Sequence, residues 1–124
     1  MKNLSSFKQA VITLDLEGVL IPEIWHRIAE VTGDETFFLT TRDVSDYDQL
    51  MALRIAGVQK HGLTLSKIRE IIASDIRPFE GALDFFRSLR SVAEVIILSD
   101  TFIEFFKVYA PCWSARLFCV MPWK

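Results

Sequence analysis

Residues 10–16, Ala-Val-Ile-Thr-Leu-Asp-Leu, are the stretch of sequence that decides the fold. β-Branched and aliphatic side chains dominate it, which is typical of a short buried strand. Residues 94–98, Glu-Val-Ile-Ile-Leu, repeat the pattern, and continuous apolar runs of this kind predict strands of a parallel sheet covered on both faces. Each run ends in a polar cluster, Asp-Leu-Glu-Gly at 15–18 and Ser-Asp-Thr at 99–101. Because α/β proteins place their sites at the carboxyl ends of parallel strands, both clusters are candidates for a functional site.

The segment between the two strands is predicted to be helical. Helices are expected over residues 22–33, which begin with a proline and end with a glycine, and over residues 46–60, which follow a capping sequence. Two more are expected around residues 65–72, where apolar side chains keep helical spacing, and over residues 80–89. An insert from about 22 to 77 is too long for a simple crossover, so it predicts a small helical cap on an α/β core. The tail from about Ala110 is expected to be irregular.

Length, composition and charge exclude several classes of protein. The 124 residues suit one domain, and 51% of them are hydrophobic, which allows a packed core. A formal net charge of -2 argues against a nucleic-acid binder, which usually has a basic stripe. We expect no membrane span and no signal peptide, hence a cytoplasmic protein. Cys112 and Cys119 match no metal-binding spacing and are expected to be small buried thiols. The paired phenylalanines are expected to fill the core.

The first polar cluster places two carboxylates two residues apart. Asp15 and Glu17 can share a pocket, because alternate residues at a strand end point the same way. One could then act as a nucleophile and the other as a general acid and base, while Gly18 lets a substrate approach the backbone closely. The alternative is an ordinary turn with two solvated acids, and the spacing alone does not separate these interpretations.

Several separate blocks occur along the sequence, in the order Asp15-Leu-Glu-Gly-Val19, Pro22-Glu-Ile-Trp25, Thr41-Arg-Asp43, Asp46-Tyr-Asp48, Arg54 and Ile97-Leu-Ser-Asp-Thr-Phe102. In this order they resemble the haloacid dehalogenase superfamily, in the branch that pairs phosphoserine phosphatase activity with phosphoryl transfer to homoserine. The resemblance covers roughly residues 10–106, and Glu17 stands where the superfamily more often has Asp. It implies a Rossmann-like core, here a partial parallel sheet, from residues 1–21 and 78–124, with a small helical cap from residues 22–77.

The same resemblance implies a mechanism and a metal. Asp15 would attack phosphorus and form an aspartyl-phosphate, and Glu17 would protonate the leaving oxygen and then activate water. A Mg²⁺ ion would bind the Asp15 carboxylate and the Glu17 backbone carbonyl. Such an ion is physically sensible, because it offsets the repulsion between an anionic nucleophile and an anionic phosphate.

The second cluster is expected to hold the phosphoryl group. Ser99 matches the superfamily's second motif, and its hydroxyl, together with backbone N–H groups around Asp100, Thr101 and Gly18, would bind the phosphoryl oxygens. Ser99 could equally be a helix N-cap, and the two roles are compatible because a phosphate at a helix start uses the same N–H donors.

Residues of the predicted cap are expected to bind the amino-acid part of the substrate. Arg54 would grip a carboxylate through two parallel hydrogen bonds. Tyr47 lies seven residues earlier, so both share a helix face, as an aromatic residue and an arginine do in the related phosphatases. Glu23 would meet the substrate ammonium group, although a solvated acid at a helix start is an equal alternative.

Two later motifs of the superfamily are absent from the sequence. Lys107 follows Ser99 too soon to be the expected lysine, and no Asp or Glu follows Glu104. We therefore expect either a truncated form of a longer enzyme or a partner chain that supplies the missing half. An exposed sheet edge should then cause low solubility or self-association as a homo-oligomer. Three functions remain open: a phosphoserine phosphatase, a phosphotransferase to homoserine, and a catalytically silent fragment that binds an anion or a partner.

Overall fold

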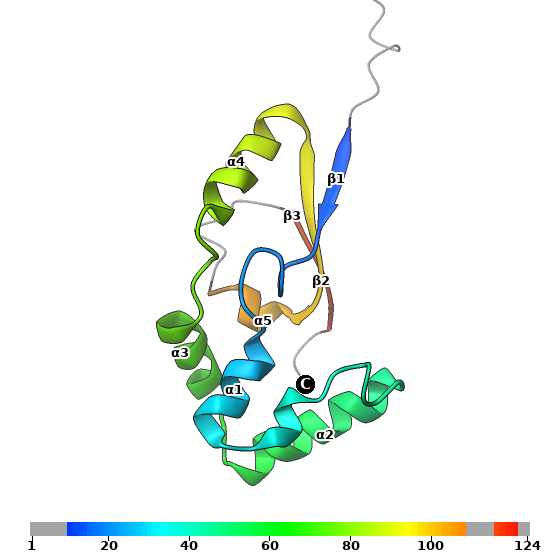
Figure 1. Cartoon of the computed structure of the whole chain (residues 1–124), viewed down its shortest axis with the longest axis vertical. Helices are drawn as coiled ribbons and strands as arrows, with labels where there is room; N and C mark the ends of the chain where they lie inside the picture. Colours follow the sequence, from blue (N-terminus) through cyan, green and yellow to red (C-terminus); the bar gives the residue numbers. More distant parts are fainter. Residues whose placement is uncertain (1–9, 109–115, 122–124) are drawn as a thin grey trace, which may run out of the picture. The chain divides into compact units, whose positions relative to one another are not determined.

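The computed structural model describes residues 10–108 and 116–121 and has an α/β architecture (Figure 1). The chain divides into two compact units. The first contains the described residues up to Pro22 and from Pro78 onward, and the second contains Glu23–Arg77. All named strands belong to the first unit, and the named elements of the second unit are helices. No helix within the described ranges is long and apolar enough to cross a lipid bilayer.

The first unit is built on a parallel sheet. Its strands are β1 (Val11–Leu14), β2 (Glu94–Phe102) and β3 (Arg116–Met121), in the order β1-β2-β3 (Figure 1). Leu14 lies opposite Ile97, so the carboxyl end of β1 meets the middle of β2. The parallel pairing predicted from the two apolar runs is confirmed.

The sheet is longer than the sequence predicted. The tail was expected to be irregular, whereas residues 116–121 form a strand parallel to β2. Its run Leu-Phe-Cys-Val-Met has the composition of a strand, but the preceding proline and polar residues obscured it. β2 also continues past the predicted end at Leu98, and its pairing with β3 is shifted between Ser99 and Phe102. The Ser-Asp-Thr cluster therefore lies within β2 and not after it.

One face of the sheet is more exposed than expected. Val95 and Ile97 are buried on one face of β2, while Leu98 on the opposite face is 50% exposed. Val11 in β1 is 57% exposed, so the prediction that both faces are covered is wrong for these residues. Alternate residues of a strand point to opposite faces, and an uninterrupted apolar run therefore does not show that both faces are packed.

The helix α4 (Ala82–Val92) contacts β2 and contributes to the core of the first unit (Figure 1). Phe86 is 1% exposed, whereas its neighbour Phe85 is 51% exposed. A short helix, α5 (Ile103–Phe106), follows β2 and buries both of its phenylalanines. The expectation that the paired phenylalanines fill the core is therefore wrong for Phe85, because successive residues of a helix face different directions.

The second unit contains the three helices expected from the sequence. They are α1 (Ile24–Thr32), α2 (Tyr47–Lys60) and α3 (Leu65–Asp75). α1 ends at Gly33, which adopts a φ of 72° and donates its N–H to the carbonyl of Ala29 at 2.8 Å. This left-handed conformation costs glycine little, which explains why the helix stops there.

A 3₁₀ turn, η2 (Glu35–Phe38), contacts α1 and α2 and was not predicted. Phe37 is fully buried, and its ring stacks on that of Trp25 with centroids 5.8 Å apart. A Cβ at Gly57 would lie 2.7 Å from Cζ of Phe37, so a glycine in α2 lets the turn approach the helix. Phe38, the other member of the pair, is 42% exposed and makes an edge contact with His26.

Asp34 makes this unit sensitive to acid. Its carboxylate contacts His61 Nε2 at 2.8 Å and accepts the Thr36 N–H at 3.0 Å, with Lys60 Nζ at 3.7 Å. These groups, His61 first, hold the pKa of Asp34 well below its ordinary value of 3.8. Because the folded state favours the ionised carboxylate, its stabilisation is present above pH 3.8 and is lost as the pH falls toward the lowered pKa.

Replacing Asp34 with Asn should therefore lower the melting temperature near neutral pH. The difference from the wild type should shrink as the pH falls below 3.8, because the Asp34 carboxyl of the unfolded wild type then takes up a proton that the folded protein does not bind. Thermal unfolding at about pH 7 and about pH 3 measures this change. An equal difference at the two pH values would contradict the assignment of the stabilisation to the ionised carboxylate.

Candidate functional site

The loop after β1 is short and tightly folded. Gly18 has a φ of 79° and donates its N–H to the carbonyl of Ile21 at 2.7 Å. Leu16 and Ile21 are fully buried and anchor the two ends of the loop. The fold of this loop leaves Asp15 exposed at the end of β1 and Glu17 half-buried.

A side-chain hydrogen bond joins this loop to the far part of β2. The Thr101 hydroxyl donates to Oε2 of Glu17, although the two residues are 84 positions apart in the sequence. The Thr101 N–H in turn donates to Oγ of Ser99 at 3.1 Å. Ser99 and Thr101 are each 4% exposed, so both hydroxyl groups are buried. The structure thus brings Glu17 of the first cluster to residues of the second cluster.

The two carboxylates have different surroundings. Glu17 is held by a buried hydroxyl, whereas Asp15 is exposed and its Oδ1 accepts the N–H of Leu16 at 2.7 Å. Asp100, on the exposed face of β2, adds another carboxylate to this strand. A solvent-accessible carboxylate next to a fixed one is compatible with a division into nucleophile and general acid and base.

The groups expected to hold a phosphoryl group are engaged within the chain. Ser99 accepts the N–H of Thr101, and Gly18 donates its own N–H to Ile21. Ser99 keeps its hydroxyl proton as a donor, because it acts as the acceptor in that bond. The alternative role of Ser99 as a helix N-cap is wrong, since α5 begins after Phe102.

The donor atoms of the first cluster are of the kind that Mg²⁺ prefers. Asp15 offers a carboxylate, and Glu17 offers a backbone carbonyl and a carboxylate. Mg²⁺ binds oxygen ligands and commonly keeps several waters, so few protein ligands are required. Among the residues that the structure describes, no group of three or more His, Cys, Asp or Glu side chains could hold a metal ion.

The predicted substrate-binding residues all belong to the second unit. Glu23 is exposed at the start of α1 and its side chain makes no capping hydrogen bond. Tyr47 and Arg54 are half-buried in α2. The Arg54 guanidinium donates from Nη2 to the carbonyl of Leu39 at 3.1 Å and lies 5.1 Å from the ring centroid of Trp25. Arg54 is thus held by its neighbours at a defined position.

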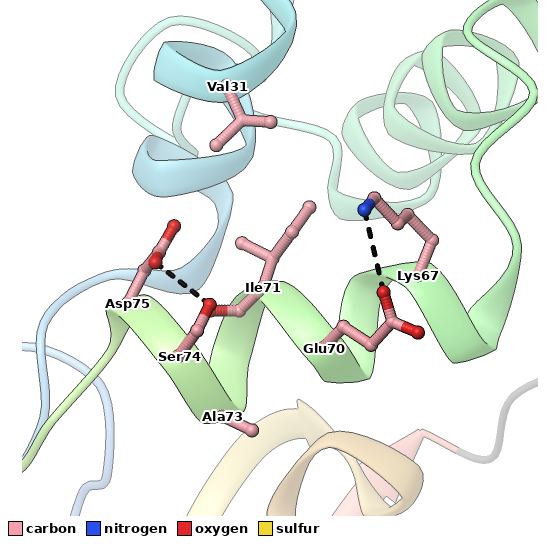
Figure 2. A pocket seen from close by; sticks show the side chains of 7 residues that line it. All are labelled: Val31, Lys67, Glu70, Ile71, Ala73, Ser74 and Asp75. Carbon is pink, nitrogen blue, oxygen red and sulfur yellow. Dashed lines mark hydrogen bonds and ion pairs between the residues drawn. The ribbon is translucent and has the colours of Figure 1, made fainter.

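A shallow hollow between α1 and α3 contains none of the predicted site residues (Figure 2). Val31 of α1 points toward Ile71 of α3, and the hollow has a volume of about 660 Å³. Its polar side chains contact one another: Lys67 pairs with Glu70 at 3.5 Å, and Ser74 donates to Asp75 at 2.9 Å. Asp75 also pairs with Arg27 at 2.9 Å. These pairs explain the polar lining as part of the helix surface.

Two features of the site were missed in the sequence. The bond between Glu17 and Thr101 links positions that no local pattern connects, although parallel pairing of the two strands already placed them at one edge of the sheet. The contact of Trp25 with Arg54 also joins separate helices. Trp25 follows Glu23 in a block noted for its resemblance, which was the one signal available.

Comparison with known proteins gives two similar sequences. No protein-family model matches the chain. The phosphoserine phosphatase ThrH of Pseudomonas aeruginosa is 52% identical over 95 residues, which are 77% of this chain and 46% of that protein. A phosphoserine phosphatase of Pseudomonas syringae pv. tomato is also 52% identical over 95 residues, which are 77% of this chain and 40% of that protein.

This similarity supports a phosphoserine phosphatase-like family for the chain. The matched part spans less than half the length of either curated relative.

Proposed function

We propose that this chain is part of a Mg²⁺-dependent phosphomonoester hydrolase of the haloacid dehalogenase type that acts on phosphoserine. The observation that supports this proposal most is the bond from Thr101 to Glu17. It fixes one carboxylate beside β2, while the neighbouring Asp15 stays exposed to a substrate. The names of the two relatives agree with this substrate.

The proposed reaction has two steps. A carboxylate oxygen of Asp15 attacks phosphorus and the bond from phosphorus to the serine oxygen breaks, with Glu17 giving its proton to that oxygen. Glu17 then takes a proton from water, whose oxygen attacks phosphorus and breaks the bond to Asp15. Serine leaves after the first step and inorganic phosphate after the second, and both carboxyl groups return to their starting states.

In this proposal the metal and the second cluster stabilise charge. Mg²⁺ would be held by the Asp15 carboxylate and the Glu17 carbonyl, and it would offset the negative charge of the phosphoryl group. The Ser99 hydroxyl and backbone N–H groups near Gly18, Asp100 and Thr101 would donate to phosphoryl oxygens. This role requires the internal hydrogen bonds of Ser99 and Gly18 to be shared with the substrate.

The second unit would act as a cap that recognises the amino acid. Arg54 would bind the carboxylate, Glu23 the ammonium group, and Tyr47 would pack against the substrate. This assignment suits a small phosphorylated amino acid. Neither nucleic acid nor a membrane is part of the proposal.

Two alternative functions are kept beside phosphoserine hydrolysis. Glu17, in place of the commoner aspartate, resembles the branch that transfers the phosphoryl group to homoserine, so homoserine is the second candidate acceptor. A catalytically silent chain that only binds an anion or a partner is the other alternative, because no Asp or Glu follows Glu104 in the sequence.

The experiment that tests the proposal is phosphate release from L-phosphoserine by the purified chain. Release should occur with Mg²⁺ and stop with EDTA, and added homoserine should give phosphohomoserine if transfer competes with hydrolysis. Size-exclusion chromatography of the same sample shows whether an active species is a homo-oligomer. No release under any condition would favour the silent fragment.

A further inference from the structure

We propose that Trp25 is a positioning residue that fixes the guanidinium of Arg54 for recognition of the substrate carboxylate. The inference rests on the proposed function for the role of Arg54, and it adds a residue to which neither the sequence nor the relatives assign a role. Trp25 is 6% exposed, and the Arg54 guanidinium carbon lies 5.1 Å from its ring centroid. This distance is within the range of an attractive cation–π contact.

Phe37 also contacts the indole ring of Trp25 and holds it in place. Phe37 stacks on Trp25 at 5.8 Å with an angle of 14° between the rings. Phe37 is fully buried, and Gly57 lies so close to it that a Cβ would be 2.7 Å from Cζ. The indole therefore has little freedom to move away from the guanidinium.

The same 3₁₀ turn supports Arg54 at a second point. Leu39, the C-cap residue of η2, accepts a hydrogen bond from Nη2 of Arg54 at 3.1 Å through its backbone carbonyl. Trp25 thus restrains the guanidinium carbon over its ring, and Leu39 restrains Nη2 through a hydrogen bond.

Such restraint matters because arginine has a long and flexible side chain. Ordering that side chain during binding lowers affinity, and a side chain held in advance avoids the loss. The effect should appear only for ligands that present a carboxylate. A substrate without one should not respond to the position of Arg54.

The contact itself is tested by NMR of the Arg54 Nε–Hε group, assigned by its absence in Arg54→Lys. The ring current of Trp25 should shift this resonance from the usual arginine position, and Trp25→Leu should return it to that position. Trp25→Phe should give a smaller shift, because it keeps an aromatic ring of reduced size. In Gly57→Ala the new Cβ would lie 2.7 Å from Cζ of Phe37 and should displace that ring. The Arg54 resonance should therefore move although neither Trp25 nor Arg54 is substituted. Val31→Ala, on an exposed part of α1, is the matched control and should leave it unchanged.

The function of the contact is tested by comparing L-phosphoserine with O-phosphoethanolamine, which lacks the carboxylate. Trp25→Leu should raise KM for phosphoserine by about tenfold and leave KM for phosphoethanolamine and both kcat values within about twofold. An unshifted Arg54 resonance in the wild type, or an equal rise in KM for both substrates, would overturn the proposal.

A failure of the proposed function is seen separately, because wild-type chain would then release phosphate from neither substrate. In that case the Arg54 resonance is followed by NMR while the wild type and Trp25→Leu are each titrated with phosphoserine and with phosphoethanolamine. Movement of the Arg54 resonance with phosphoserine and not with phosphoethanolamine, at a lower ligand concentration in the wild type than in Trp25→Leu, would support the role of Trp25. The same concentration dependence in both proteins, or no selective movement, would overturn it.

Discussion

Replacing Asp15 with Asn is expected to lower phosphate release from L-phosphoserine by on the order of 10⁴-fold or more. The amide cannot form the covalent phosphoryl bond that the proposed mechanism requires. Asp15 is exposed at the end of β1, and the substitution is nearly isosteric, so the fold should be unaffected. The change should therefore appear in kcat and not in the melting temperature.

A matched control is available in the same unit. Asp84 lies on α4, and its side chain is 90% exposed, so Asp84→Asn should retain the wild-type rate. Colorimetric phosphate release with equal amounts of folded chain measures both variants. Wild-type activity in Asp15→Asn would remove Asp15 from the role of nucleophile.

Replacing Phe86 with Ala should lower the free energy of unfolding by about 3–5 kcal/mol. Phe86 is 1% exposed in α4, and its ring also contacts the Arg90 guanidinium at 6.0 Å. Removing the ring deletes buried apolar surface and leaves a cavity that the surrounding side chains fill only in part. Because α4 contacts β2, the substitution should also destabilise the strand that contains Ser99 and Thr101.

The neighbouring residue provides the control. Phe85 is 51% exposed, so Phe85→Ala should change the free energy of unfolding by no more than about 0.5 kcal/mol. Urea denaturation followed by circular dichroism measures both variants. Similar losses for the two substitutions would show that the burial of α4 in solution differs from the structure.

Local patterns in the sequence predicted the helices and the paired strands. The capping sequence at residues 45–48 predicted a helix from Asp46 to about Lys60, and α2 is present. The cap lies one residue later than predicted, because Asp46 and not Ser45 accepts the N–H of Gln49, at 3.1 Å. The end of α1 follows from the left-handed conformation of Gly33. These signals act over a few residues and can therefore be seen in the sequence.

Features that depend on distant partners could not be predicted. β3 exists because the edge of β2 offers it hydrogen bonds, and the exposed face at Leu98 depends on which elements cover the sheet. The turn η2 depends on space provided by Gly57. The bond from Thr101 to Glu17 likewise needs the sheet to form first.

The candidate site shows the same division between local and distant signals. The carboxylates at Asp15 and Glu17 were visible in the sequence as a motif after a strand. Their different surroundings, one exposed and one bonded to a buried hydroxyl, became apparent only in the structure. Their roles in catalysis remain predictions.

The most direct test of the central proposal is the mass of the chain after it is mixed with L-phosphoserine and Mg²⁺ and quenched in acid. Acid preserves an acyl phosphate long enough for peptide mapping. The proposal predicts one added phosphoryl group on the peptide that contains Asp15, and none in Asp15→Asn. Phosphate release by the wild type with no phosphorylated peptide, or with the phosphoryl group on another residue, would contradict the proposed aspartyl-phosphate at Asp15.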